Sequence, residues 1–440
     1  MGTEPLSRRS FLAAAGLTGL SVPLLGACGG GSDDSDPGGS GGSAGSSKKV
    51  TLEWWNIATT EPGKSLFPQI ASAFMAANPN VTIKTTVLEN EAFKAKMTAQ
   101  TSSGKLPDIF HTWGGGVLKQ QIDAGLVQDL TAKASSWATS TLSATSLNPY
   151  QFDGKLYAIP FDIGMVGFWY NKKLFAKAGI TAPPATWSAY IDAVKKLKAA
   201  GVTPIALAGK DKWPGMYYWA YLALRVGGLP ALQQAQSSND FTGPAFVQAG
   251  QHLKELSDLA PFQQGYQGAA YDAPGGQAAT MGSGKAGMEL MGQWGPEVEK
   301  AAGKGIGSDL GFFPFPAVEG GQGKVTEVFG GGGGHALRKG APDAAIDFLK
   351  FFVNAENEHK LIASNGYLPV VKGTESQITD PNRKIVASTV AGATGFQLFL
   401  DQAFPPAVGQ EVNDSVIDLI AGKKTPEQVT QQITKTAKSQ

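Results

Sequence analysis

The sequence predicts an α/β protein with two domains, and three observations support this prediction. Strand-like segments alternate with helical segments of about 10–15 residues, the pattern that builds βαβ units around a parallel sheet. Of the 440 residues, 42% are hydrophobic and 17% are charged, so the chain can bury a large core. About 390 residues follow a polar N-terminal segment, and at roughly 100–200 residues per domain this length favours two domains.

The first α/β set begins after residue 47. We expect its strands at residues 50–55, 81–87 and 107–112, and its helices at residues 66–77 and 91–102. In parallel sheets, ligands bind outside the carboxyl ends of the strands. We therefore expect a site in the loops that follow these strands, at residues 56–63, at residues 113–116 and after Pro160.

A second α/β set begins near Phe161. The expected strands are residues 166–170, 203–207 and 286–291. The expected helices are residues 172–178, 187–199, 217–226, 246–259, 342–353, 356–364 and 407–420, with a last one from Thr425. Between them lie five consecutive glycines, residues 330–334. Glycine allows unusual backbone angles and close approach, so this run suits a crossing between domains; a turn facing a ligand is the alternative.

The N-terminus has the features of an export signal. Residues 7–12 (SRRSFL) form a twin-arginine signature, an apolar run follows to Leu25, and residues 25–28 (LGAC) have the pattern of a lipobox. The apolar run falls short of the roughly 20 residues that a spanning helix requires. We therefore expect residues 1–27 to be a Tat lipoprotein signal peptide and Cys28, the only cysteine, to be acylated. A lone buried thiol is the alternative.

Residues 29–47 contain only Gly, Ser, Asp, Ala and Pro, a composition that predicts a flexible linker. We therefore interpret residues 28–47 as an acylated cysteine followed by this linker. Such a linker has an r.m.s. reach of about 22–26 Å. These features predict a protein anchored by lipid at the extracellular face of the cell membrane.

The charge balance excludes some partners. Without residues 1–27, the basic residues fall from 37 to 35 and the acidic ones from 36 to 35, because Arg8, Arg9 and Glu4 are lost. A net charge near zero argues against nucleic acid or an anionic lipid surface as the partner.

Motifs for catalysis or cofactor binding are missing from the sequence. The four histidines do not form a metal-binding spacing, and no G-x-S-x-G elbow is present. Residues 282–285 (GSGK) resemble part of a phosphate loop, but Ala286 stands where a Ser or Thr is required. We therefore expect no cofactor, no metal and no enzymatic activity.

Tryptophans and carboxylates gather at the predicted strand ends and in the loops after them. The tryptophans are Trp54, Trp55, Trp113, Trp213 and Trp294, and the carboxylates are Glu61, Asp108, Asp162 and Asp211. Aromatic rings can stack on the C–H faces of a sugar, and carboxylates accept pairs of hydroxyl hydrogens. Each tryptophan could instead be a core residue and each carboxylate a cap or turn residue; Asp108 could equally brace its own loop. Two carboxylates at one pocket could also indicate a glycosidase.

Five segments resemble the extracellular sugar-binding proteins of bacterial ABC importers, the family that includes maltose-binding protein. They are residues 154–160 (GKLYAIP), 170–180 (YNKKLFAKAGI), 183–187 (PPATW), 284–288 (GKAGM) and 366–370 (GYLPV). The resemblance, which runs from about Val50 to the end, implies a two-lobe, hinged, periplasmic-binding-protein-like fold. It places the crossings between lobes near residues 159–163, 329–334 and 368–372. The implied lobes are residues 48–160 with 333–370, and residues 161–332 with 371–440.

The resemblance also implies the site residues. They are Thr59, Thr60, Glu61, Asp108, Thr112, Trp113, Asp162, Asp211, Lys212, Trp213 and Trp294. The implied protein is a monomer that captures a mono- or short oligosaccharide, with a disaccharide like xylobiose as one example, and delivers it to the permease subunits of an ABC transporter. The loop after Trp55 departs from the maltose-binding pattern, which argues against maltose. An exported glycoside hydrolase and a binder of a non-sugar solute with the same fold stay open as alternatives.

Overall fold

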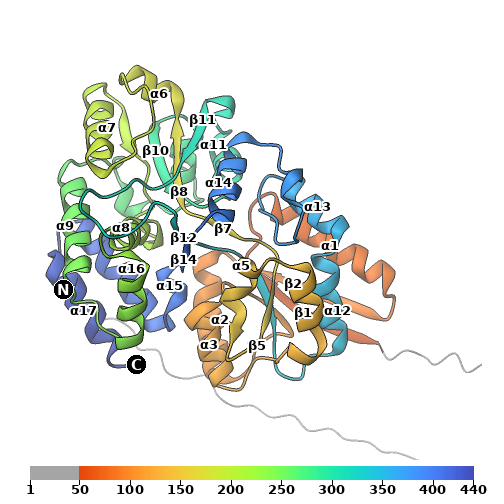
Figure 1. Ribbon diagram of the computed structural model, residues 1–440. Coiled ribbons are helices and arrows are strands. Elements are labelled where there is room, and N and C mark those ends of the chain that lie inside the picture. The colour runs from red at the N-terminus through yellow and green to blue at the C-terminus, as the bar shows by residue number, and fades with distance from the viewer. Residues whose placement is uncertain (1–48) are drawn as a thin grey trace, which may run out of the picture. The chain divides into compact units, whose positions relative to one another are not determined.

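The computed structural model describes residues 49–440 (Figure 1). The predictions for the signal peptide, for Cys28 and for the linker (residues 28–47) lie outside the described residues. No helix within the described part of the chain is both long and apolar enough to cross a bilayer.

The first sheet has five strands in the order β2-β1-β3-β13-β6. Its strands are β1 (Val50–Asn56), β2 (Val81–Val87), β3 (Ile109–Thr112), β6 (Ala158–Pro160) and β13 (Gly334–Leu337). As predicted, β1 is parallel to β2 and β3, whereas β13 is antiparallel to β3 and β6. The helices of this part are α1 (Gly63–Ala77), α2 (Asn90–Ser103), α3 (Gly115–Asp123), α12 (Asp343–Phe352) and α13 (Ala355–Ala363).

The core of this part is aromatic. Trp54 of β1 is fully buried, stacks on Phe67 at a centroid distance of 5.7 Å and meets the edge of Phe348 at 5.2 Å. Trp54 is therefore a core residue, the alternative that the sequence left open. Trp55, which points to the other face of β1, lies under the ammonium group of Lys96, 4.2 Å from the ring centroid.

The second sheet has the order β11-β8-β10-β9 and is mixed, so the expectation of parallel strands fails here. Its strands are β8 (Gly167–Asn171), β9 (Thr203–Ile205), β10 (Ala286–Met291) and β11 (Leu310–Phe313). Only β9 and β10 pair in parallel; β8 is antiparallel to both β10 and β11. The reason is the entry point of the chain. Strand β8 comes soon after the first crossing, and β13 begins at the end of the glycine run. Each therefore starts at the edge of its sheet where β10 or β3 ends, and so runs antiparallel to that strand.

A third, small sheet lies between these two in Figure 1. It has the order β14-β12-β7, with β7 (Gly164–Met165), β12 (Glu327–Gly331) and β14 (Gly395–Leu398). The glycine run joins β12 to β13, as expected of a crossing. A Cβ at Gly330 would overlap the carbonyl oxygen of Gly164, so only glycine lets these backbones approach.

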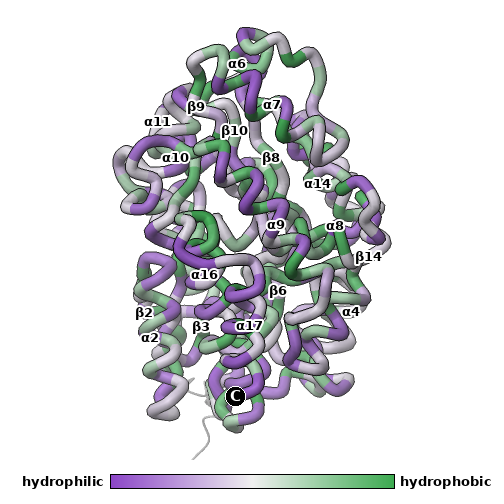
Figure 2. Tube along the Cα trace, turned by 90° about the vertical axis from the view of Figure 1, so that its left-hand side faces the viewer, coloured by the Kyte–Doolittle hydropathy of each residue, from purple (hydrophilic) through white to green (hydrophobic). Residues whose placement is uncertain are grey.

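Several further helices lie close to the predicted ranges. They are α6 (Lys172–Lys177), α7 (Trp187–Ala199), α9 (Pro244–Asp258), α16 (Pro406–Ile420) and α17 (Pro426–Ala437). Helix α17 carries a few hydrophobic residues among hydrophilic ones (Figure 2). Val429 and Ile433, one turn apart, are buried on its inner face. Helix α8 (Trp213–Ser238) is longer than the predicted 217–226 at both ends. The glycines after Val226 look like a helix end, but the chain only kinks at Gly228 and then continues as a helix.

The sequence did not predict seven α-helices of the described residues: α3, α4 (Ser136–Thr141), α5 (Ala144–Leu147), α10 (Gln277–Gly282), α11 (Gly295–Gly303), α14 (Pro381–Ala391) and α15 (Leu400–Ala403). Helices α11 and α15 matter most for the site, because each carries residues of its wall.

Candidate ligand-binding site

A cavity lies between the loops of the first sheet and those of the second. The volume of this cavity that is open to the centre of a water molecule is about 230 Å³. One wall comes from the loop between β1 and α1 (Ile57 to Pro62) together with Asn90, Lys94, His111 and Trp113. The opposite wall holds Trp213, Tyr217, Tyr271, Asp272, Trp294, Val298, Phe399, Asp401 and Gln402, and the crossings contribute Phe161, Asp162, Gly332, Gly333, Gly366 and Tyr367. The cavity therefore lies at the carboxyl ends of β1 and β3, the edge that the sequence indicated.

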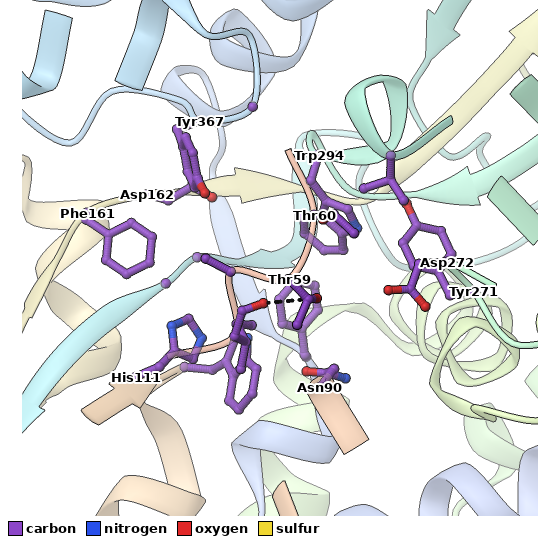
Figure 3. Close-up of a pocket in the computed structure, with 18 of the residues that line it drawn as sticks. Thr59, Thr60, Asn90, His111, Phe161, Asp162, Tyr271, Asp272, Trp294 and Tyr367 are labelled. Atoms are coloured by element: carbon purple, nitrogen blue, oxygen red, sulfur yellow. Dashed lines mark hydrogen bonds between the residues drawn. The ribbon is translucent and has the colours of Figure 1, made fainter. Parts of the chain in front are cut away.

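Seven of the eleven predicted site residues line this cavity. They are Thr59, Thr60, Glu61, Trp113, Asp162, Trp213 and Trp294. Figure 3 shows Thr59, Thr60, Asp162 and Trp294 around one space. The loop after β1 is shaped locally, because the Asn56 side chain accepts a hydrogen bond from Ala58 N (3.0 Å) and Ile57 O accepts one from Thr59 N (2.8 Å).

Asp108 and Thr112 do not line the cavity. Strand β3 begins at Ile109, so Asp108 lies at its amino end, the edge remote from the cavity. Its carboxylate accepts a hydrogen bond from Glu53 N (2.8 Å) and pairs with Arg338 Nη2 (2.8 Å). Thr112 is buried, and its hydroxyl oxygen accepts a hydrogen bond from Gly114 N (3.1 Å). Asp108 therefore stabilises the backbone around the start of β3, which is the alternative interpretation given above. Thr112 stabilises the turn that leads to Gly114.

Asp211 and Lys212 also lie outside the cavity lining. Asp211 accepts a hydrogen bond from Tyr271 N (2.6 Å), and Lys212 pairs with Asp414. Both residues precede α8, and they hold Tyr271 and the start of α8 rather than facing the cavity.

Asp108→Asn is expected to leave the Kd for ligand within about twofold of wild type and to lower the free energy of unfolding by about 1–3 kcal/mol. The carboxylate that joins β1, β3 and β13 loses its charge, and the amide then turns a donor toward Glu53 N or Arg338. Calorimetry measures the first quantity and urea denaturation the second. A large loss of affinity without a loss of stability would contradict this role.

Aromatic rings form a continuous wall on the side of the second sheet. Trp213 lies 5.4 Å from Tyr217 and 5.3 Å from Tyr271, and Tyr217 stacks on Phe399 at 5.5 Å. Phe399 meets Trp294 edge to face at 6.1 Å. Such a wall offers flat apolar faces, while Thr, Asn, Gln, Asp and Glu side chains around it offer hydrogen bonds.

The sequence missed several lining residues because they do not directly follow a predicted strand. Lys94 lies in the middle of α2, Asp401 lies on the unpredicted helix α15, and Tyr271 lies in a long loop. Lys94 Nζ pairs with Asp401 Oδ2 (3.0 Å) and with Glu91 Oε1 (3.2 Å). Burial works to lower the pKa of Lys94, but Asp401 and Glu91 raise it above its usual value. Tyr367 belongs to residues 366–370, a segment that carries the family resemblance, but the resemblance implies no site role for it.

Two glutamates are buried behind the aromatic wall. Glu289 of β10 accepts a hydrogen bond from Gln277 Nε2 (3.1 Å), and the carboxyl group of Glu299 of α11 lies close to that of Glu289. Burial raises the pKa of Glu289 to about 7, and burial together with the charge of Glu289 raises that of Glu299 well above its usual value. Two carboxyls in one apolar site cannot both ionise, so the pair retains a proton at neutral pH. These carboxyls do not line the cavity.

Over residues 49–440, no three His, Cys, Asp or Glu side chains are grouped so that they could hold a metal ion. The carboxylates that line the cavity are Glu61, Asp162, Asp272 and Asp401. Both oxygens of Asp162 accept protein hydrogen bonds, and Asp401 is paired with Lys94.

The chain is similar to known binding proteins over most of its length. The family described as bacterial extracellular solute-binding protein matches residues 58–359. A multiple sugar-binding protein of Streptococcus mutans is 26% identical over 380 residues, which cover 83% of this chain and 84% of that protein.

Two solved structures share the fold. One comes from work on xylan utilization by the thermophilic bacterium Caldanaerobius polysaccharolyticus; it is 32% identical, has a TM-score of 0.81, and the match covers 88% of this chain and 99% of that one. The other is a chitin oligosaccharide binding protein with 27% identity and a TM-score of 0.81, where the match covers 89% of this chain and 98% of that one. Structures of this kind confirm the two-lobe fold that the sequence predicted.

Proposed function

Because the chain belongs to the bacterial extracellular solute-binding proteins, we propose that it captures a mono- or short oligosaccharide in this cavity and delivers it to an ABC import permease. The observation that carries the proposal is the aromatic wall of Trp213, Tyr217, Tyr271 and Trp294, faced by polar side chains across the cavity. Rings of this kind stack on sugar C–H faces, while the polar groups select hydroxyl geometry.

Two of the similar structures support a choice of ligand class. A structure at 32% identity comes from work on xylan utilization, and another is a chitin oligosaccharide binding protein. We propose a xylan-derived disaccharide such as xylobiose as the first ligand to test, with chitin-derived oligosaccharides second.

The mechanism that we propose is closure of two lobes on the intact ligand. One lobe comprises residues 48–160 with 333–370, and the other residues 161–332 with 371–440. A ligand that contacts both walls binds the closed state more tightly and shifts an existing equilibrium toward it. In this mechanism no bond is made or broken and no cofactor is needed, and we propose that the receptor is a monomer.

The location is proposed from the sequence. The twin-arginine signature, the lipobox ending at Cys28 and the linker to residue 47 favour export, removal of residues 1–27 and acylation. The protein would then be held by lipid at the extracellular face of the membrane, where a permease can receive its ligand.

The test is a thermal-shift screen of the purified protein with mono- and disaccharides, followed by calorimetry. A ligand at 100 times its Kd stabilises the folded state by about 2.7 kcal/mol, so it raises the melting temperature. Xylobiose or a related oligosaccharide is expected to do so, and glycerol at the same concentration serves as the control. A screen in which amino acids, peptides or polyamines stabilise the protein while saccharides do not would contradict the proposal.

A glycoside hydrolase is the alternative to be tested in the same samples. Incubation with the bound oligosaccharide is expected to return it unchanged. Slow hydrolysis that disappears when Glu61 or Asp272 is replaced would favour the enzyme.

A further inference from the structure

Asp162 connects backbone segments that are distant in sequence. It lies in the first crossing, between β6 and β7, and borders the cavity (Figure 3). Phe161 N and Asp162 N both donate hydrogen bonds to Gly333 O, at 2.9 and 3.3 Å. A Cβ at Gly332 would overlap the carbonyl oxygen of Asp162, so the first two crossings lie in direct backbone contact.

The Asp162 side chain also accepts hydrogen bonds from the third crossing and from the turn that precedes α11. Its Oδ1 accepts a hydrogen bond from Leu368 N (2.8 Å), 206 residues further along the chain. Its Oδ2 accepts one from Gln293 Nε2 (2.6 Å), 131 residues further along. Gln293 directly precedes Trp294, so one carboxylate holds both the third crossing and the residue next to this tryptophan.

The position of Gln293 is fixed on its other side as well. Its side chain is fully buried and packs against Gly164, where a Cβ would overlap the amide. Gly164 belongs to the same segment as Asp162. The amide of Gln293 is thus held by the first crossing through both packing and a hydrogen bond.

We propose that Asp162 is a positioning residue whose carboxylate, by holding Gln293 and Leu368, fixes the Trp294 turn against the crossings and so sets ligand affinity. The side chain is 7% exposed and each of its oxygens already accepts a hydrogen bond from the protein, so about half of its acceptor capacity is used in holding Gln293 and Leu368. The inference rests on the proposed function, since it takes Trp294 to contact the ligand.

Charge gives this role a pH dependence. Burial raises the pKa of Asp162 to about 6, although the hydrogen bonds from Leu368 and Gln293 and the charge of Arg383 act to lower it. Tyr150, Tyr367 and Glu358 are the other titratable groups that its charge affects. Above about pH 6 the carboxylate accepts both hydrogen bonds. Below it, the added proton has an acceptor only once the Gln293 amide flips, so affinity is expected to fall to the level of Asp162→Asn, within about threefold of its value at neutral pH.

The test is a double-mutant cycle with Asp162→Ala, Gln293→Leu and the double variant, read by calorimetry. Each single variant is expected to raise Kd about tenfold, because a hydrogen bond to a charged group is lost. The double variant is expected to be no worse than either single one, since both remove the same connection. Asp258→Ala, which removes an exposed carboxylate paired with Lys254, is the matched control and should leave Kd unchanged.

Asp162→Asn separates positioning from charge. Its Oδ1 can accept from Leu368 N, and its Nδ2 can donate to Gln293 Oε1 once that amide flips. Gln293 Oε1 has no hydrogen-bond partner among the described residues. We expect this variant to bind within about threefold of wild type and to lose the decline in affinity below pH 6. A variant as weak as Asp162→Ala, with Gln293→Leu unaffected, would show that the carboxylate contacts the ligand itself and would overturn the inference.

A measurement without ligand separates this inference from the proposed function. In Asp162→Ala, amide hydrogen exchange is expected to become faster both at Leu368 and in the turn around Gln293. Unchanged exchange in the turn would overturn the inference. A wild-type protein that bound no saccharide would overturn the proposed function alone, because the exchange result would still stand.

Discussion

Replacing Trp294 with alanine is expected to raise the Kd for the bound saccharide about tenfold or more. One aromatic stack with its buried area contributes about 1.5 kcal/mol, which corresponds to roughly a tenfold change in Kd. The ring is held in place before the ligand arrives: it lies over Gly292, where a Cβ would overlap it, and against the edge of Phe399. A fixed ring loses little conformational freedom on binding, so most of the stacking energy appears as affinity.

Calorimetry of Trp294→Ala and Trp294→Phe measures this effect. The phenylalanine variant keeps a stacking face and is expected to recover most of the affinity. Trp55→Ala is the matched control, because Trp55 is a half-buried tryptophan that lies outside the cavity lining and packs under Lys96. Equal Kd values for Trp294→Ala and wild type would remove Trp294 from the binding site.

Much of the fold follows from local patterns in the sequence. The alternation of Val81 to Val87 and the apolar spacing of residues 187–199 define a strand and a helix by themselves, and both have the predicted bounds. Strand direction is a different matter. Whether β8 runs with or against β10 depends on where the chain enters the second sheet, and no periodicity within β8 carries that information.

Among the site residues, too, some could be predicted from local sequence and others depend on the folded chain. Thr59, Thr60, Trp113 and Trp294 could be predicted because they stand directly after strands, and the resemblance marked the same loops. Lys94 and Asp401 could not, because they are 307 residues apart and only the folded chain brings their charges together. Asp108 differs for another reason: it precedes β3, which begins at Ile109, so it lies at the amino end of this strand, whereas the cavity lies at the carboxyl ends.

The buried glutamate pair leads to the second large effect, on stability. Burial raises the pKa of Glu289 to about 7 and that of Glu299 well above its usual value, so the folded protein keeps protons that the unfolded chain releases above about pH 4.5. The stability from this pair is fully present below that pH and is lost as the pH rises through about 7 and beyond. Asp162 and Glu358, whose pKa values burial raises to about 6 and about 7, act in the same direction.

Two buried histidines act in the opposite direction. Burial lowers the pKa of His111 to about 3 and that of His335 well below its usual value. Their contribution is complete above about pH 6.5 and is lost as the pH falls toward their folded-state values. The two trends oppose each other between about pH 4.5 and pH 6.5, and above about pH 6.5 only the loss from the carboxyls remains.

Glu299→Gln is therefore expected to flatten the alkaline side of the stability profile. The wild-type free energy of unfolding should fall by on the order of 2 kcal/mol between pH 6 and pH 8.5, measured by urea denaturation at each pH. In the variant, the amide of residue 299 can donate to the Glu289 carboxylate without losing a proton, so most of that fall should disappear. Glu53→Gln, which changes an exposed carboxylate on β1, should keep the wild-type profile. A Glu299→Gln profile as steep as wild type would mean that the pair holds no proton near neutral pH, and that other groups produce the alkaline decline.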